Sequence, residues 1–324
     1  MATLTEYGLG LEDMATQIAP DGTLLPMVDA LKQTNSIIQD GIFLPANAPF
    51  ANKGMRLTKE PRGTVSKLNQ GVATSRPQWE NYMDNLSLIK ALSESDVDVI
   101  DASPSPEGTL NIIARTFVNG IGKTLCAHAL YGNSTYNSSE MYGVASRLNS
   151  ISNSANVLNA GGSGSDLTSM YIITWEPDGA HFLYPRGDSP GLEHVSNGKV
   201  LVADPNDANA KIEVYQDYFK VKLGFGVGNE KAIGRIANIE TSGASNIFDE
   251  EMLVFLKNRM YITPNTKIYV NETIMSQMQI RLTQKSNVYF SKEDGLDGGG
   301  PVMRFDGVEV RKEDQILITE SAIS

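Results

Sequence analysis

The chain has 324 residues, of which 41% are hydrophobic and 20% are charged, and its formal net charge is −11. This length allows about two domains and a sizeable core. No run of about 18 apolar residues could span a bilayer, and the first residues lack the features of a signal peptide. The acidity argues against a general nucleic-acid-binding protein, since Lys and Arg make the contacts to phosphate.

Residues 1–50 are predicted to form an N-terminal arm. Two short helices are expected first, in "LEDMATQIAPDG", which Pro20 and Gly22 end, and in "LLPMVDALKQTN", which has apolar residues on one face. The following "DGIFLPANAPFANKG" combines two prolines with two glycines and has no periodicity that could fill a core. An apolar but irregular segment of this kind is expected to lie on another surface.

Residues 51–100 are predicted to form a long basic loop in an otherwise acidic chain. The alternation around Arg56 predicts a strand, Pro61–Gly63 a turn, and Thr64–Leu68 the returning strand. An isolated hairpin is only marginally stable in water, so this one needs a partner surface. Docking on an acidic neighbour explains its length and charge better than a solvated loop does. The expected contact residues are Arg56, Lys59, Arg62 and Lys67.

A long helix is predicted over about residues 106–130. Ser105 is a suitable N-cap, Pro106 suits the first helical position, and Gly132 can end the helix. Apolar residues recur every three or four positions, as one face of a single helix requires. They are Leu110, Ile113, Phe117, Ile121 and Leu125.

The stretch "NGIGKT" within this helix resembles the end of a phosphate-binding loop. The full motif needs a glycine five positions before Gly122, and Phe117 stands there instead. A glycine inside a helix costs about 1 kcal/mol relative to alanine, and close approach of another backbone would offset that cost. Gly120 and Gly122 are therefore predicted to be packing positions, together with Phe117.

The rest of the chain is predicted to form strands and two further helices. The segments "TSMYIITWE", "AHFLYP", "GKVLVA", "KIEVYQDYFKVKLGFGV" and "KAIGRIANIE" are typical of strands. "FDEEMLVFLKNRMYI" and "NETIMSQMQIRLTQK", with Asn271 as N-cap, are typical of helices. Asp306-Gly307 between two strands predicts a type I′ hairpin turn.

Enzyme motifs fail when each is tested against its requirements. "GFGVGN" lacks the third glycine of a dinucleotide-binding fingerprint. His128, His181 and His194 lie far apart in sequence, without a second ligand at metal-binding spacing. The single Cys126 lies on the long helix and is expected to be a small buried hydrophobic residue. No catalytic, cofactor-binding or metal-binding residue is therefore predicted, although sequence alone leaves a distant constellation open.

Several long blocks of the sequence resemble major capsid proteins of short-tailed double-stranded DNA bacteriophages. Their order and spacing match from about residue 11 to residue 245. The blocks are "LEDMATQIAPDG", "QTNSIIQD", "RLTKEPRGTVSKLNQGVATS", "ALYGNSTYNSSEMYGVASRLNSIS", "NAGGSGSDLTSMYIITW", "YPRGDSPGLEH" and "RIANIETS".

The resemblance implies an α+β fold of the Hong Kong 97 capsid type. The implied plan is an N-terminal arm at residues 1–50, an extended loop at 51–100, and a peripheral domain at 101–154 that contains the spine helix. An axial domain at 155–299 and closing strands at 300–324, returning to the peripheral domain, complete it. The arm, the loop and the long helix follow one another in the order that this plan requires.

The implied function is that of a structural shell protein, without enzymatic activity or a cofactor, in the virion capsid. The implied partners are other copies in pentamers and hexamers, a scaffolding protein, a decoration protein and a portal, and assembly is expected in the bacterial host cytoplasm. The shell would enclose double-stranded DNA without sequence-specific binding or a membrane. No isopeptide crosslink is predicted, because nothing marks one of Lys53, Lys59 and Lys67. An encapsulin-like compartment and a soluble oligomeric enzyme are the alternatives.

Overall fold

The computed structural model describes residues 35–152, 154–188, 191–204, 210–243, 245–283, 290–293 and 302–324. The two short helices expected in the N-terminal arm lie outside these residues. The chain divides into two compact units, each of which is discontinuous in sequence. Among the described residues, unit 1 contains 35, 88–127 and 191–222, and unit 2 contains 36–87, 128–188 and the residues from 223 onward.

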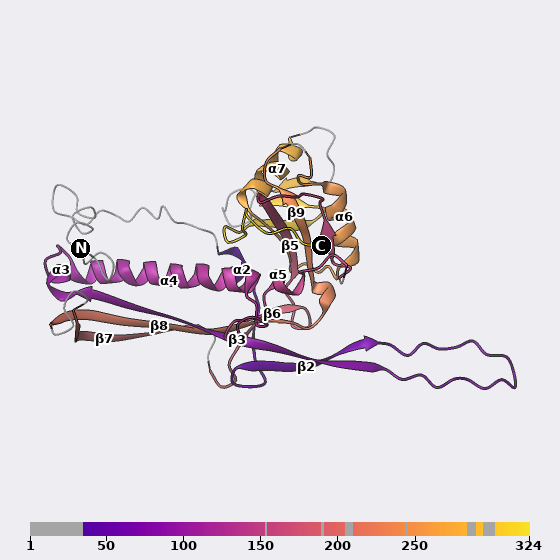
Figure 1. Ribbon diagram of the computed structural model, residues 1–324, viewed down its shortest axis with the longest axis horizontal. Helices are drawn as coiled ribbons and strands as arrows, with labels where there is room; N and C mark the ends of the chain where they lie inside the picture. The colour runs from indigo at the N-terminus through magenta and orange to yellow at the C-terminus, as the bar shows by residue number, and fades with distance from the viewer. Residues whose placement is uncertain are drawn as a thin grey trace. The chain divides into compact units, whose positions relative to one another are not determined.

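Unit 1 is built on the helix α4 (Pro106–Tyr131), which belongs to it up to Ala127. The strands β7 (Leu192–Ala203) and β8 (Lys211–Val227) form an antiparallel pair whose register runs from Leu192↔Val221 to Ala203↔Lys211. The strand β8 packs on the helix through Phe219, whose ring stacks on that of Phe117 at 5.7 Å. The end of β3 (Gln78–Asp96) and the short helix α3 (Val97–Asp101) complete this unit (Figure 1).

The helix α4 confirms the prediction for residues 106–130. The backbone N–H of Gly108 donates to the Ser105 hydroxyl at 3.3 Å, which is the expected N-cap bond. Ile121, Leu125 and Cys126 are buried, as the helical period predicts. Because the helix runs unbroken through Lys123, no loop surrounds a phosphate here, and the phosphate-loop interpretation is excluded.

Unit 2 contains a mixed sheet with the strand order β11-β12-β13-β10-β5-β9-β4. The helices α6 (Glu250–Arg259) and α7 (Glu272–Leu282) pack on it, with Leu253, Ile274 and Met278 fully buried in a common core. The interior strand β5 is buried at every position, and its polar side chains are hydrogen-bonded, as when the Thr168 hydroxyl donates to the Leu317 carbonyl at 2.7 Å. The strands are β4 (Val157–Asn159), β5 (Leu167–Thr174), β9 (Ile233–Glu240), β10 (Thr266–Val270), β11 (Phe290–Glu293), β12 (Val302–Phe305) and β13 (Val308–Lys312).

Local signals in this unit act as the sequence predicts. The Asn271 side chain accepts a hydrogen bond from the backbone N–H of Ile274 at 2.9 Å and so caps α7. Asp306 and Gly307 both have positive φ, at 45° and 81°, and join β12 to β13. This is the left-handed backbone that a type I′ turn requires at both central positions.

The described part of the N-terminal arm is integrated into unit 2, contrary to the expectation that it lies on another surface. After the helix α2 (Ser36–Asp40), the strand β1 (Phe43–Pro45) pairs in parallel with β6 (Ala180–Tyr184). The ring of Phe182 stacks on Phe43 and on Trp175, each at 5.3 Å. A strand as short as β1 is too brief to show a hydrophobic period. The sequence pattern therefore did not reveal that this segment contributes to the core.

One predicted domain boundary differs from the compact units. Residues 191–222, assigned to the axial range 155–299, group with most of the spine helix, because β8 buries Val214, Phe219 and Val221 in unit 1. The closing segment 302–324 lies in unit 2, where β13 pairs in parallel with β10. It also contacts the predicted peripheral range 101–154, since the Tyr131 hydroxyl donates to Glu320, and the return of these strands to the peripheral domain stays a prediction.

Candidate functional site

An extended hairpin leaves the body of unit 2. It consists of β2 (Ala51–Lys59), a tip at residues 60–77 without regular pairing, and β3 from Gln78 to Ser87. The strands are antiparallel from Ala51↔Asn85 to Lys59↔Gln78. The hairpin thus confirms the predicted two-stranded excursion. The predicted turn at Pro61–Gly63 and returning strand at 64–68 are wrong, because pairing resumes only at Gln78.

The root of the extended hairpin, where it leaves unit 2, is fixed by side-chain and backbone contacts. Asn47 accepts a hydrogen bond from the backbone N–H of Lys53 at 2.9 Å, and the backbone N–H of Leu86 donates to Phe50 at 3.0 Å. Gly54 lies directly opposite Tyr82 in the register. A Cβ at position 54 would stand 2.4 Å from the tyrosine ring, so only glycine allows the ring to lie there. These contacts give the hairpin a defined root.

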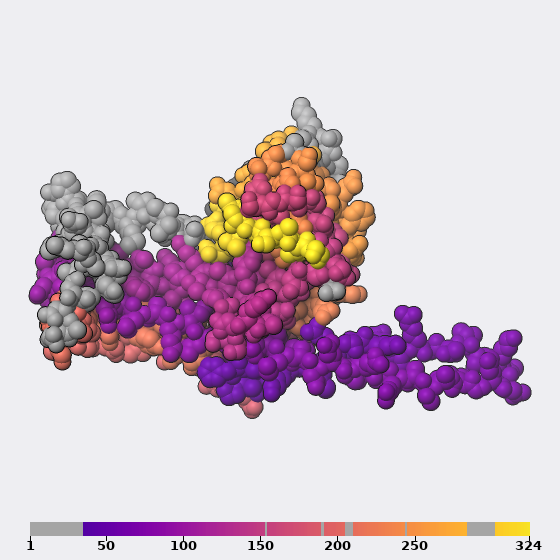
Figure 2. Space-filling model, viewed as in Figure 1, coloured from indigo at the N-terminus to yellow at the C-terminus, as the bar shows by residue number. Residues whose placement is uncertain are grey.

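The tip carries a basic and apolar surface with no cover from the described part of the chain. Every residue from 57 to 81 is exposed, and Figure 2 shows the tip extending away from the rest of unit 2. Val65 and Leu68 are 101% and 99% exposed. Other large apolar side chains along the hairpin are also more than a third exposed, namely Met55, Leu57, Val72, Trp79 and Met83. Leu57 and Trp79 are direct cross-strand partners, so exposed apolar side chains gather here, as is typical of an interaction site.

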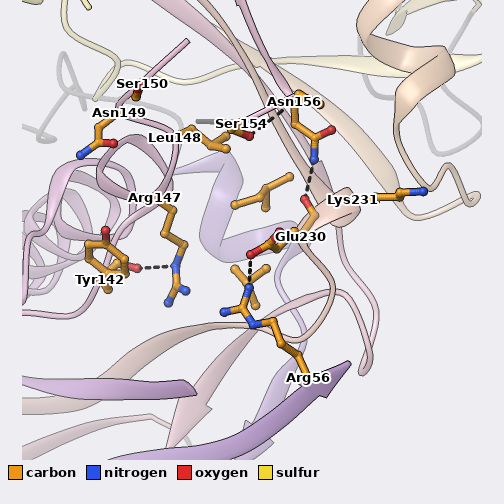
Figure 3. Close-up of a pocket in the computed structure, with 13 residues that line it drawn as sticks. Arg56, Tyr142, Arg147, Leu148, Asn149, Ser150, Ser154, Asn156, Glu230 and Lys231 are labelled. Atoms are coloured by element: carbon orange, nitrogen blue, oxygen red, sulfur yellow. Dashed lines mark hydrogen bonds and ion pairs between the residues drawn. The ribbon is translucent and has the colours of Figure 1, made fainter. Parts of the chain in front are cut away.

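The four predicted contact residues divide into two groups. Lys59, Arg62 and Lys67 are exposed near or on the tip, where a second molecule can reach them. Arg56 instead forms an ion pair with Glu230 of its own chain (Figure 3). Its guanidinium lies 5.2 Å from the centre of the Tyr82 ring. In the single chain an intrachain carboxylate thus holds Arg56, and its contact with a neighbouring copy stays a prediction.

A second ion pair lies beneath the hairpin. The Arg147 guanidinium bonds the Asp84 carboxylate, and their side chains are only 10% and 2% exposed. Arg147, at the end of α5 (Val144–Arg147), also donates to the backbone carbonyls of Tyr142 at 3.0 Å and Phe225 at 3.2 Å. Such contacts with both carboxylate and carbonyls are what a buried guanidinium needs to offset its desolvation.

Two titratable groups next to this pair have shifted pKa values. Burial raises the pKa of the Tyr82 phenol, and the Asp84 carboxylate adds to the rise. Burial lowers the pKa of His181, although Asp84 opposes the shift by favouring the protonated imidazole. The root of the hairpin is therefore a partly desolvated polar cluster, and its histidine favours the neutral form.

The spine-helix residues have different environments from one another. Phe117 packs on Phe219 in unit 1, as predicted. Gly120 is exposed, and a Cβ there would meet no atom of the described chain within 4 Å. The predicted close backbone at Gly120 is therefore wrong for the single chain. Gly122 is partly exposed, and its packing role stays a prediction.

Three contact residues escaped sequence reasoning: Asp84, Arg147 and Glu230. Each is far from its partner in the chain: the residue numbers of Asp84 and Arg147 differ by 63, and those of Arg56 and Glu230 by 174. No local sequence pattern indicates ion pairs between residues so far apart in the chain. The site thus combines fixed ion pairs with an exposed basic tip. Among the described residues, no cluster of three His, Cys, Asp or Glu side chains could hold a metal. None of the described helices is long and apolar enough to cross a membrane.

Comparison with known proteins gives a family and a fold. A family model described as "Major capsid protein GP7" matches residues 19–324. A solved chain of bacteriophage Epsilon15 is 23% identical, with a TM-score of 0.75 over 100% of this chain and 99% of that chain. That likeness confirms the predicted α+β fold of the Hong Kong 97 capsid type. No curated protein matches the chain.

Two further solved structures are less similar. The capsid of bacteriophage JBD30 is 11% identical, with a TM-score of 0.48 over 89% of this chain and 93% of that chain. The encapsulin complex of Synechococcus elongatus PCC 7942 is 9% identical, with a TM-score of 0.43 over 71% of this chain and 95% of that chain. Because the family match covers most of the chain, it favours a phage capsid over the compartment alternative.

Proposed function

Because the chain belongs to the family of the major capsid protein GP7, we propose that its extended hairpin joins neighbouring copies in the head shell of a tailed bacteriophage. The chain is a structural subunit of the virion capsid. The proposal adds that subunits associate as pentamers and hexamers, enclose double-stranded DNA without reading its sequence, and assemble in the host cytoplasm. No catalytic step is assigned to it.

The observation that carries the proposal is the exposed apolar tip. Val65 and Leu68 are essentially fully exposed in the single chain. Burying one such side chain stabilises a complex by about 1.5–3 kcal/mol before association costs. Each copy in a closed shell repeats this contact, so a modest gain per contact becomes a large gain for the particle.

The charge of the hairpin gives the contact its direction. Between residues 51 and 80 there are six basic residues and two acidic ones, in a chain whose net charge is −11. A basic projection from an acidic body is attracted to the body of another copy and repelled by another projection. Electrostatic complementarity of this kind sets orientation and association rate more than affinity. Docking of Lys59, Arg62 and Lys67 on an acidic neighbouring surface is part of the proposal.

Other components of a head belong to the proposal only in general terms. A scaffolding protein, a decoration protein and a portal are the partners expected of such a shell. The resemblance of the sequence to phage capsid proteins supports them, and no residue of this chain is assigned to their contacts.

Charge reversal at the tip tests the proposal. Arg62→Glu combined with Lys67→Glu should leave the subunit folded, because both side chains are exposed and lie outside the core. Assembly should fail, because the reversed tip is repelled by the acidic body of the neighbour. Circular dichroism of the subunit and electron microscopy of the assembly reaction measure the two effects.

The matched control exchanges the same two residues without changing charge, as Arg62→Lys combined with Lys67→Arg. That variant should form closed shells. Normal shells from the charge-reversed variant would contradict the role of the hairpin, and the absence of any closed assembly from the unmodified chain would contradict the shell function itself.

A further inference from the structure

A pocket of about 360 Å³ lies at the root of the extended hairpin, and all its lining residues belong to unit 2 (Figure 3). Arg56 enters it from β2, and Arg147 and Asn156 come from the segment that follows α4. Glu230 and Lys231 come from the short helix η2 (Glu230–Ala232). Three cationic side chains thus line the pocket, with Glu230 as the single carboxylate among the lining residues.

Arg147 is a fixed part of this pocket. Its guanidinium is held by Asp84 and by two backbone carbonyls, and it lies 4.8 Å from the centre of the Tyr142 ring. A side chain held in this way loses little rotamer entropy when a further group binds beside it. Arg147 therefore contributes a pre-organised positive charge to one side of the pocket.

Arg56 is paired less completely. One terminal nitrogen contacts one oxygen of Glu230, and the buried Nε has no hydrogen-bond partner among the described residues. A guanidinium offers a fork of donors that fits a carboxylate through two parallel bonds. A buried donor without a partner costs about 1–3 kcal/mol. The Arg56 fork is therefore only partly used in the single chain.

Glu230 has a fixed backbone, and its side chain is exposed although it pairs with Arg56. Its carbonyl accepts a hydrogen bond from Asn156 Nδ2 at 2.8 Å, and the Asn229 side chain caps the short helix through the backbone N–H of Lys231 at 3.0 Å. The Glu230 side chain, in contrast, is 74% exposed. Rotation about its own bonds is enough to remove its carboxylate from Arg56, so the backbone need not move.

We propose that this pocket is a carboxylate-binding site for a second copy of the chain, and that Glu230 occupies it within the free subunit. The inference rests on the proposed shell function. On assembly, an acidic side chain of the neighbouring copy takes the place of Glu230 at Arg56. The acidity of the chain supplies such carboxylates on its body, and the unpaired Nε gives the incoming group a bond that Glu230 does not make.

The two partners of Arg56 then compete, and this competition predicts opposite effects of two substitutions. Glu230→Gln removes the internal competitor and leaves the site open. Arg56→Gln removes the site itself. If the pair only supported the fold, both substitutions would weaken the subunit and neither would help assembly.

The experiment measures the lowest subunit concentration at which closed shells form, by light scattering and electron microscopy at one fixed salt concentration. Glu230→Gln should lower this concentration about two- to fivefold, and Arg56→Gln should raise it by a similar factor, as expected of an exposed ion pair. Glu176→Gln is the matched control. It also removes one negative charge from unit 2, and its side-chain oxygen can still accept the bond from Asn265 at 3.2 Å.

Glu230→Asp provides a second route if the glutamine variant does not fold. Because the aspartate side chain is shorter, its carboxylate reaches less far toward Arg56. The lowest subunit concentration at which closed shells form should therefore also fall. An unchanged or raised concentration for the Glu230 variants would overturn the inference. Failure of the unmodified chain to form any shell would instead overturn the proposed function.

Discussion

The ring of Tyr82 lies over Gly54, its direct cross-strand partner at the root of the extended hairpin. A Cβ at position 54 would stand 2.4 Å from Cζ of that ring, which is far inside van der Waals contact. The same ring supports the guanidinium of Arg56 at 5.2 Å. The absence of a side chain at one position thus determines how a neighbouring cation is held.

Gly54→Ala should destabilise the unassembled subunit by about 1–3 kcal/mol, the usual cost of overpacking. The tyrosine ring must move, and Arg56 loses its support. Thermal unfolding measures the loss. Combining Gly54→Ala with Tyr82→Ala opens the space, so the double variant should be more stable than the sum of the two single losses predicts. Strict additivity would show that the two residues do not press on each other.

Breaking the buried pair beneath the hairpin should cost much more than breaking a surface pair. Asp84→Ala leaves the Arg147 guanidinium buried without its carboxylate, which costs about 3–5 kcal/mol. The comparison is Glu272→Gln, which breaks the pair of Glu272 with Lys312, whose side chains are 79% and 37% exposed, and which should cost at most about 1 kcal/mol. Denaturant titration of both subunits tests the difference, and equal losses would contradict it.

The stability of the subunit should fall as the solution becomes acidic, through His181. Burial lowers the pKa of its imidazole in the folded chain, so the unfolded chain binds a proton first as pH falls. This contribution to stability is complete above about pH 6.5, the usual histidine pKa, and is lost as pH falls toward the folded-state pKa. The slope cannot exceed about 1.4 kcal/mol per pH unit for one proton.

The groups around His181 set the size of this effect. Asp84 favours the protonated imidazole and Arg147 opposes it, and both act on the same ring. In a His181→Gln variant, the dependence of the unfolding free energy on pH between about 5 and 7 should be weaker than in the parent. If the pH dependence of the unfolding free energy is unchanged in this variant, it arises from carboxylates and not from His181.

Gly120→Ala should stabilise the unassembled subunit by about 1 kcal/mol. The position lies inside α4, and the added methyl group meets no atom of the described chain. Gly132→Ala is the contrasting variant, because its Cβ would stand 2.5 Å from the carbonyl oxygens of His128 and Met141 and should destabilise. Melting temperatures of the two subunits decide, and a loss of stability in Gly120→Ala would show that space there is restricted.

Unassembled subunits should not bind duplex DNA at about 150 mM salt, where the Debye length is about 8 Å. A shell that must release its genome gains nothing from tight phosphate contacts, and the net charge of −11 opposes them. Simple solubility of an acidic subunit would also explain the charge. Micromolar binding that weakens steeply with added salt would show that a basic surface meets the genome.

Local chemistry made part of this fold predictable. Ser105 and Pro106 mark the start of α4, Asn271 caps α7, and Asp306-Gly307 forms its turn, because each signal acts within a few residues. The family resemblance supplied the overall plan. The division into two compact units could not be predicted from local signals. The strands β7 and β8 group with α4 although they come from a distant part of the sequence.

The site was predictable in its charge and only partly in its contacts. A surplus of Lys and Arg marked the hairpin, and its tip is exposed. Pairing, however, resumes at Gln78 instead of Thr64, because strand register depends on the partner strand and not on alternation alone. Arg56 finds Glu230 across 174 positions, a distance over which sequence patterns carry no information.

The exposed tip of the hairpin also allows assembly to be followed by proteolysis of the chain itself. Trypsin cleaves after exposed lysine and arginine, and Arg62 and Lys67 lie in a segment without regular pairing, the kind of site at which nicking concentrates. A free subunit is therefore open to cutting between β2 and β3, whereas a neighbour that covers the tip shields the same bonds. The time at which a chain becomes resistant to trypsin therefore shows when its hairpin has docked. In a sample of incomplete particles, the fraction of chains that trypsin still cuts measures how many hairpins remain undocked.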